Sequence, residues 1–336
     1  MVDQGRLEGS FVSKLLFAVV IPLAGIMAFY LYLYLSDPTP KVFEPDRTLF
    51  PFQSRYLELD DGNRIHYIDE GKGPTLLLLH GNPTWSFLYR DIIAGLKDSF
   101  RLVAPDYPGF GLSRARAGYG FTPVEHARAI SALVRQLDLK NIVIMMQDWG
   151  GPIGFAVALE NPERVQGFVI GNTWAWPLER PGQKGFSLLM GGWPGRFGAG
   201  CCNAVVRFFM FKGVATGLSD RELAMYLGPF VQRANRAPTH ISPAQLRGAH
   251  LFLADIYKGL PTLSDRPALL IWGMKDFAFQ TPERERFETL FPKHETLLLE
   301  NAAHFIQEDA PDEIVAAIRG WRERVFPEND RDDASR

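Results

Sequence analysis

The chain has 336 residues, of which 46% are hydrophobic and 22% are charged, and its formal net charge is −2. This is the composition of a folded globular protein, which excludes a disordered chain, and the small net charge excludes a general attraction for nucleic acid. The only two cysteines, Cys201 and Cys202, are neighbours, so the sequence also excludes a disulfide framework and a Cys-x-x-Cys metal site.

An uncharged run of 21 residues, 15–35, follows a short amino-terminal tail of residues 1–14. As a helix it would be about 31 Å long, which matches the roughly 30 Å apolar core of a bilayer. Three tyrosines gather at its end, as in the aromatic belt of a spanning helix. We therefore expect a single-pass transmembrane anchor. The alternative is a cleaved signal peptide, whose apolar region is about 7–15 residues long and ends at small residues.

The charges that flank this run give a weak indication of its orientation. Slightly more Lys and Arg follow the run than precede it, which places the large domain in the cytoplasm. The unbridged cysteines agree with a reducing compartment. Residues 36–52 contain four prolines and are interpreted as a linker.

From residue 53 onward, apolar strands alternate with helices. An Asp-Gly pair between two alternating runs predicts a hairpin over residues 55–71, and continuous apolar runs then predict buried parallel strands. The predicted strands are 75–81, 101–106, 141–148, 164–172, 267–276 and 295–304, and the predicted helices are 85–97, 123–137, 152–160, 283–290 and 311–325. This alternation predicts an α/β fold with a mostly parallel sheet and helices on both faces.

Residues 176–262 interrupt the alternation, because they contain apolar helical stretches and glycine-rich turns but no clear strand. We interpret them as a helical cap inserted between two core segments, 53–175 and 263–326, with a polar tail at 327–336. The cap carries ten Lys and Arg against four Asp and Glu. Two interpretations of this basic surface stay open, a solvated face and a face that rests on anionic lipid.

The residues MMQDWGGPIG, 145–154, place an aspartate where a buried strand passes into a helix. This pattern resembles the nucleophile elbow of α/β-hydrolases, in which small residues let strand and helix approach closely. A carboxylate at position 148 is ionised at neutral pH and can form an ester with a substrate carbon. The alternative is that Asp148 only caps the helix. Met146 departs from the usual elbow, which has a small residue at that position.

Two further groups follow in the chain order nucleophile, acid, histidine. Asp276 follows one predicted strand and His304 follows the last one, so both stand at carboxyl ends of strands, where open α/β sheets bind ligands. We predict a triad in which His304 is the general base and Asp276 orients it. Asp106 is assigned to a turn, and Asn172 cannot serve as the acid.

The loop HGNPTW, 80–85, follows the first predicted parallel strand. In this fold such a loop supplies a backbone N–H to an oxyanion, together with the residue after the nucleophile. Here these residues are Asn82 and Trp149. Their side chains carry an amide and an indole N–H, which can solvate a departing halide in a dry pocket. The alternative is that Trp149 only packs under the cap and Asn82 only stabilises a turn.

These motifs make the chain resemble the haloalkane dehalogenases from about Arg55 to Phe326. The matching stretches are HGNPTWSFLYR (80–90), PDYPGFGLS (105–113), QDWGGPIG (147–154), YLGPF (226–230), WGMKD (272–276) and HFIQEDAPDEI (304–314). The resemblance implies the nucleophile Asp148, the base His304, the acid Asp276 and the halide-binding pair Asn82 and Trp149, which is the branch with an Asp-His-Asp triad.

The same resemblance implies an α/β-hydrolase fold that converts haloalkanes to a primary alcohol and halide through a covalent aspartyl ester. Its partners would be a small apolar halogenated substrate and water, without a metal or cofactor. The family is generally soluble, so the expected membrane anchor at 15–35 departs from it.

Two other functions stay open. An epoxide hydrolase would share the triad but needs cap tyrosines to protonate the opening oxygen, and Tyr226 and Tyr257 are available. A membrane-tethered binding protein on the same scaffold would need no catalysis, although such proteins usually lose a triad member. A fluoroacetate-type dehalogenase is disfavoured because it carries Arg after the nucleophile.

Overall fold

The computed structural model describes Gly25, Ala28 and residues 43–327. An eight-stranded sheet forms its centre, in the order β1-β2-β4-β3-β5-β6-β7-β8. β2 pairs antiparallel with β1 and β4, and the strands from β4 to β8 pair in parallel. The strands are β1 (Arg55–Glu58), β2 (Arg64–Gly71), β3 (Thr75–Leu79), β4 (Arg101–Pro105), β5 (Ile142–Asp148), β6 (Val165–Thr173), β7 (Ala268–Gly273) and β8 (His294–Leu299). The predicted mostly parallel sheet is confirmed.

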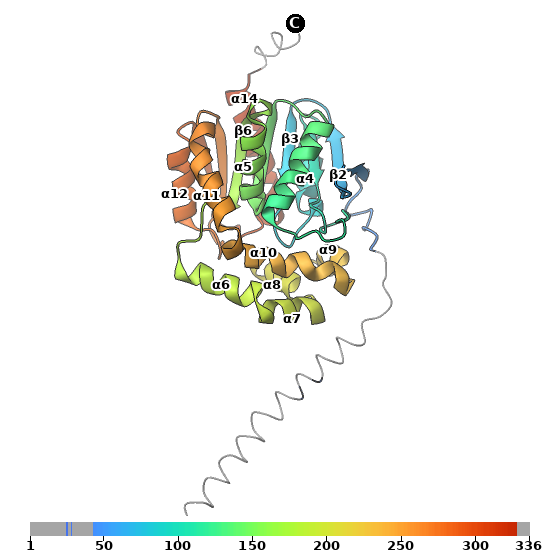
Figure 1. Cartoon of the computed structure of the whole chain (residues 1–336). Helices are drawn as coiled ribbons and strands as arrows, with labels where there is room; N and C mark the ends of the chain where they lie inside the picture. Colours follow the sequence, from blue (N-terminus) through green and yellow to red (C-terminus); the bar gives the residue numbers. More distant parts are fainter. Residues whose placement is uncertain (1–24, 26–27, 29–42, 328–336) are drawn as a thin grey trace, which may run out of the picture.

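Helices cover both faces of this sheet (Figure 1). One face carries α3 (Arg90–Leu96) and α14 (Pro311–Val325), and the other carries α4 (Pro123–Gln136), α5 (Gly150–Glu160), α11 (His250–Gly259) and α12 (Thr281–Leu290). The central strand β5 is buried along its whole length, as its run of Ile, Val and Met requires. α4 begins at the predicted residue, where Thr122 and Glu125 form a reciprocal capping box.

The cap lies beyond the carboxyl ends of the parallel strands (Figure 1). Its helices are α6 (Pro181–Gly191), α7 (Trp193–Cys202), α8 (Ala204–Gly213), α9 (Asp220–Leu227) and α10 (Ala237–Gly248). The predicted range 176–262 also includes α11, which packs against α5 beside the sheet. Arg90 of α3 joins cap and core, because its guanidinium pairs with Glu222 of α9 at 3.1 Å and with Glu308 of α13 (Ile306–Asp309).

The predicted linker differs from the structure in its described part. Phe50 and Phe52 are buried in the core, and the Phe50 ring meets the Trp85 ring at 5.1 Å. Burial of these aromatic side chains removes apolar surface from water, which stabilises the folded protein. Residues 43–52 therefore pack onto the domain and do not form an exposed linker. The expected membrane span, 15–35, lies outside the described residues except for Gly25 and Ala28. No helix in the described part of the chain is long and apolar enough to cross a bilayer.

Candidate active site

Asp148 ends β5 in a strained turn. Its φ is 51°, in the left-handed region, and the register between β5 and β6 shifts between Gln147 and Asp148. The turn is crowded, because a Cβ at Gly81 would lie 2.4 Å from the Asp148 Cβ, and one at Gly151 would lie 2.0 Å from Thr173 Oγ1. The backbone therefore turns sharply and presents the carboxyl group at the sheet edge, as the elbow pattern predicts.

The Asp148 carboxyl group is held by backbone donors. The N–H of Asn82 donates to Asp148 Oδ1 at 2.8 Å, and the N–H of Trp149 also bonds to this carboxyl group. Burial raises the pKa of Asp148, while the charge of His304 and the two N–H groups lower it by less. The carboxyl group is thus almost withdrawn from water, with Oδ1 fixed and Oδ2 facing His304.

His304 lies between the two aspartates that the sequence assigned to it. Its Nε2 is 3.6 Å from Asp148 Oδ2 and its Nδ1 is 3.0 Å from Asp276 Oδ2. The amide nitrogen of Gln147 lies 3.0 Å from Nε2. Because Nδ1 faces a carboxylate and Nε2 faces an amide donor, the proton of the neutral ring belongs on Nδ1. Nε2 is then the basic nitrogen and faces Asp148, the predicted nucleophile.

The pKa of His304 reflects these neighbours. Burial by itself lowers it, but the charge of Asp276, the hydrogen bond to Asp276 and the charge of Asp148 outweigh burial, so the pKa is raised above its ordinary value. β8 ends at Leu299, earlier than predicted, and His304 lies in the loop that follows it. The structure therefore brings the three predicted triad residues together from three different strand ends.

A cavity of about 170 Å³ lies above Asp148. Asn82, Trp149 and His304 line it together with Asp148, so the predicted halide pair and the nucleophile face one space. The remaining wall is mostly apolar: Leu178, Phe186, Phe209, Pro243, Leu246, Phe277, Ala278 and Phe279. The amide nitrogen of Asn82 also donates to Thr239 O of the cap at 3.3 Å, which orients this side chain toward the cavity and uses one of its two N–H groups.

The comparisons with known proteins agree with this geometry. The chain matches the alpha/beta hydrolase fold family over residues 74–311. It is 48% identical over 284 residues to haloalkane dehalogenase 2 of Mycobacterium tuberculosis (strain ATCC 25618 / H37Rv), an alignment that covers 82% of this chain and 97% of that relative. The chain belongs to the haloalkane dehalogenase family. The resemblance read from the sequence motifs is therefore confirmed.

The chain is also similar to one solved structure and to one relative of a different name. A mutant form of the haloalkane dehalogenase DatA from Agrobacterium tumefaciens C58 has a solved structure with a TM-score of 0.74 and 25% identity, covering 82% of this chain and 99% of that one. A cis-3-alkyl-4-alkyloxetan-2-one decarboxylase of Shewanella oneidensis is 33% identical over 287 residues, which cover 81% of this chain and 89% of that relative.

The two cap tyrosines that could serve an epoxide hydrolase lie outside the cavity of this haloalkane dehalogenase family member. Tyr226 is fully buried and its hydroxyl donates to Glu308, while the Tyr257 hydroxyl accepts a hydrogen bond from Arg286 at 3.0 Å. Neither residue lines the cavity, and no tyrosine is among the described residues that do. The described lining of the cavity therefore offers no tyrosine hydroxyl to an opening epoxide.

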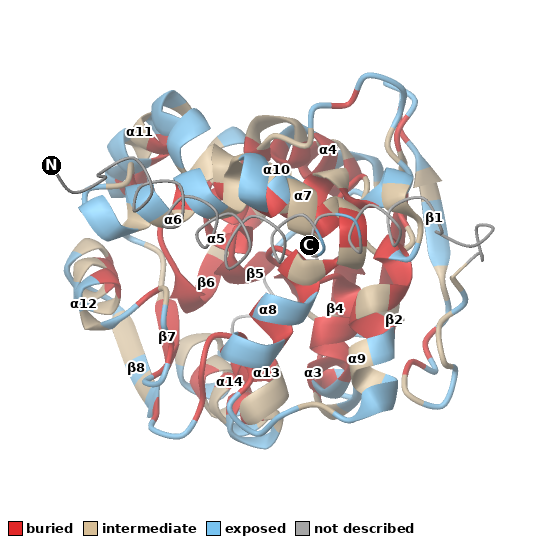
Figure 2. Ribbon diagram, turned by 90° about the horizontal axis from the view of Figure 1, so that it is seen from below, coloured by how far each residue is buried: buried red, intermediate tan, exposed pale blue. Residues whose placement is uncertain are grey.

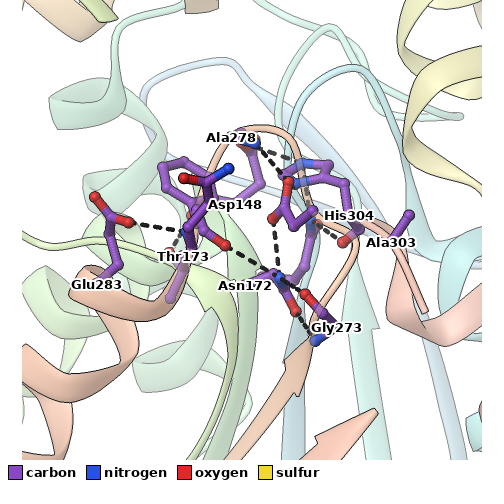
Figure 3. Close-up of polar contacts among 12 residues, drawn as sticks. Asp148, Asn172, Thr173, Gly273, Ala278, Glu283, Ala303 and His304 are labelled. Carbon is purple, nitrogen blue, oxygen red and sulfur yellow. Dashed lines mark hydrogen bonds and ion pairs between the residues drawn. The ribbon is translucent and has the colours of Figure 1, made fainter. Parts of the chain in front are cut away.

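The sequence did not indicate that Asn172 holds Asp276, the predicted acid of the triad, in place. Asn172 is fully buried at the end of β6, with a φ of 29°, and its amide donates to Asp276 Oδ2 at 2.9 Å. It also accepts the N–H of Gly273 at 2.7 Å (Figure 3). Asn172 is thus a positioning residue, and its signal in the sequence was a polar residue ending a buried strand. Gln147, which contacts His304, is a second such residue.

Asp106, predicted to stabilise its turn, accepts hydrogen bonds from the loops around it. Its carboxylate accepts the backbone N–H groups of Ser86 at 2.7 Å and Leu112 at 2.8 Å, and it pairs with His66 at 2.8 Å. It does not line the cavity, so it holds the loops behind the site without facing the substrate.

Proposed function

We propose that this chain hydrolyses haloalkanes to an alcohol and halide through a covalent ester on Asp148. The observation that carries the proposal is the position of one carboxyl group. Asp148 Oδ1 accepts a backbone N–H at 2.8 Å, while Oδ2 lies 3.6 Å from the basic nitrogen of His304, at the base of an apolar cavity. This geometry supports three roles around one carboxyl group: Oδ2 as the nucleophile, the backbone N–H at Oδ1 as the oxyanion site, and His304 as the base.

In the first step Asp148 Oδ2 attacks the carbon that bears the halogen. The C–O bond forms as the carbon–halogen bond breaks, and the halide leaves with the bonding electron pair. The indole N–H of Trp149 and the second amide N–H of Asn82 would solvate the halide, since both side chains line the same cavity. A carboxylate held in so little water is a stronger nucleophile than one in solution.

In the second step His304 takes a proton from a water molecule, which attacks the ester carbonyl carbon. The carbonyl oxygen derives from Oδ1, so the N–H of Asn82 already points at the atom that becomes negative, and the N–H of Trp149 bonds to the same carboxyl group. Asp276 stabilises the imidazolium that forms at 3.0 Å from it. Collapse of this intermediate releases the alcohol, which takes the proton from His304. The hydrogen that remains on the Asp148 carboxyl group is lost to solvent as a proton, which restores the carboxylate.

The test separates the two steps by removing the base. His304→Phe should release one equivalent of halide from 1-bromobutane and then stop, with the enzyme heavier by the mass of a butyl group. In the unchanged enzyme, one turnover in heavy-oxygen water should label the peptide that contains Asp148. Full turnover by the variant, or product formed without label in that peptide, would exclude the mechanism.

A second candidate substrate class follows from one comparison. The Shewanella oneidensis relative is an oxetan-2-one decarboxylase by name, at 33% identity over most of this chain. A strained four-membered lactone also offers an electrophilic carbon and an anionic leaving group to Asp148. Assaying 1-bromobutane, a 3,4-dialkyl-oxetan-2-one and styrene oxide in parallel, for bromide, alkene and diol, distinguishes the three activities. Bromide release above the other two rates supports dehalogenation.

We also propose that residues 15–35 anchor the chain in a membrane with the catalytic domain in the cytoplasm. The support is the length of this uncharged run and the slight excess of cations after it. The full-length protein should stay with the membrane fraction after alkaline carbonate washing. Cys202, which is partly exposed, should be labelled by an impermeant maleimide only after the cells are opened. Complete release by the wash would contradict the anchor.

A further inference from the structure

The outer face of the cap is unusually apolar for a surface. Figure 2 looks onto this side of the molecule and shows exposed turns in α6 and α8. Of the twelve large hydrophobic side chains that are exposed in the described chain, five lie within these 24 residues, 188–211: Leu188, Leu189, Trp193, Phe208 and Phe211. Trp193 is 74% exposed and Phe211 is 80% exposed. These residues lie on α6, α7 and α8, which pack against one another. Exposed hydrophobic side chains gathered on adjoining helices mark an interaction surface, whereas single ones do not.

The charged residues on the same face are all cationic. The forty residues 180–219 contain five Lys and Arg and no Asp or Glu, although the whole chain has a net charge of −2. Lys184, Arg196, Arg207 and Lys212 among them are exposed. Beside Trp193 a groove of about 430 Å³ is lined by Arg196, Phe197 and His240, so cations and indole stand together. Cations around exposed aromatic and aliphatic side chains match the headgroup region of an anionic bilayer.

This face also continues into the entrance of the active-site cavity. Phe208, which is 39% exposed, contacts Phe277 with ring centroids 6.3 Å apart, and Phe277 lines the cavity. Phe186 of α6 lines the cavity and is followed by the exposed Leu188. Apolar side chains thus connect the outer face of the cap with the wall of the cavity that contains Asp148.

Phe43, the first residue of the described segment 43–327, lies beside the cap. The Phe43 ring meets Trp85 at 5.7 Å, and it fills the space next to Gly228, where a Cβ would lie 2.1 Å from it. Only residues 36–42 separate it from the end of the apolar run, a stretch that spans at most about 25 Å. The chain is thus tied to that run at the cap end of the domain and not at the opposite end of the sheet.

We propose that the outer face of the cap, residues 184–212, docks on an anionic lipid bilayer and directs the cavity entrance toward it. Leu188, Leu189, Trp193 and Phe211 enter the interface, and the surrounding cations contact lipid phosphate groups. A second copy of the chain is the competing occupant, but two faces with no carboxylates would repel each other. An anionic bilayer pairs with the cations and also buries the exposed apolar side chains.

The tryptophans make the proposal measurable in the full-length protein. Trp193 is 74% exposed, and the other six tryptophans are at most 6% exposed. In vesicles whose acyl chains carry bromine, which quenches indole fluorescence at contact, quenching should therefore report Trp193. We expect quenching with 30% phosphatidylglycerol, loss of most of it in pure phosphatidylcholine or 0.5 M salt, and its absence in Trp193→Phe.

Matched charge variants separate the cap from the anchor. Replacing Arg196, Arg207 and Lys212 by Gln should reduce quenching in anionic vesicles to the level in neutral vesicles. Replacing Lys72, Lys97 and Lys293 by Gln, exposed residues at the other end of the sheet, should leave the quenching unchanged.

Three results would each overturn the proposal: Trp193 is not quenched in anionic vesicles, quenching is equal in neutral and anionic lipid, or the two triple variants have equal effects. So does an emission shift that follows protein concentration without lipid, which would indicate self-association. None of these readings depends on the reaction, so the proposed function can fail separately.

Discussion

The floor and the roof of the active-site cavity are built by different means. The floor consists of Asp148, Asp276 and His304, which lie at or shortly after strand ends and are fixed by backbone geometry and buried hydrogen bonds. The roof consists of side chains such as Phe186 and Leu246 on cap helices, which are fixed only by packing. This difference teaches that the floor determines the reaction and the roof determines what reaches it. Substitutions in the two regions should therefore affect different kinetic parameters.

The largest effect is expected from the nucleophile. Asp148→Ala removes the atom that bonds to carbon, so halide release should fall at least about 10⁴-fold while the fold persists. Halide release and circular dichroism measure the two properties. Asp98→Ala, an exposed carboxylate away from the cavity, is the control and should retain full activity. Residual activity within tenfold of the unchanged enzyme would contradict the assignment.

The next effect concerns the support of the acid. Asn172→Ala leaves Asp276 with one donor fewer and the Gly273 N–H without its acceptor. Loss of such buried bonds costs about 1–3 kcal/mol, so ester hydrolysis should slow by roughly tenfold to a hundredfold. Formation of the ester, which needs no base, should change much less. Rapid-quench measurement of the halide burst and the steady state resolves the two; equal slowing of both would indicate a purely structural role.

A smaller effect concerns pH. His304 must be neutral to act as a base, so ester hydrolysis is present above its pKa and is lost as pH falls through it. The negative charge of Asp148 helps to raise that pKa in the free enzyme, and the ester carries no such charge. Hydrolysis of the ester should therefore persist to a lower pH than the one at which His304 titrates in the free enzyme. Single-turnover rates and NMR titration of the imidazole give the two midpoints.

Asp148→Asn provides the matched control for this comparison, because its neutral amide resembles the ester in charge. Its His304 titration should move down to the midpoint of ester hydrolysis. Coincident titrations in the free enzyme and the variant would show that Asp148 does not influence the imidazole.

The smallest effect belongs to the roof. Leu246→Ala enlarges the cavity without touching the triad, so the relative kcat/KM for longer over shorter bromoalkanes should rise by about tenfold or less. The burst of halide from 1-bromobutane should keep its amplitude. A change in burst amplitude instead of chain-length preference would show that the roof also shapes the floor.

The floor was predictable because its information is local. The Gly-Gly-Pro stretch after Asp148 and the strand ends before Asp276 and His304 are readable along the chain. Asn172 and Gln147 were not assigned their roles, because their partners are more than a hundred residues away and the pattern of one strand does not reveal them. The loop at 80–85 and the position after Asp148 predicted the roles of Asn82 and Trp149, and the family resemblance implied the same pair. The structure shows that both residues line one cavity.

The roof and the amino-terminal segment were less predictable for a different reason. Apolar helical runs in the cap predict helices, but which face meets the cavity depends on tertiary packing between α6 and α10. The predicted linker, 36–52, contains four prolines, although Phe50 and Phe52 at its end are buried in the core. The composition of a short segment does not indicate whether a hydrophobic site such as the one beside Trp85 exists elsewhere in the fold.

The crowding around the elbow has a consequence for directed evolution. Gly81 and Gly151 leave no space for even a methyl group beside Asp148 and Thr173, so codon randomisation there would yield mostly inactive clones. Positions such as 178, 183 and 246 line the cavity without touching that turn. A small library restricted to these positions would explore new substrates at little cost in folded protein.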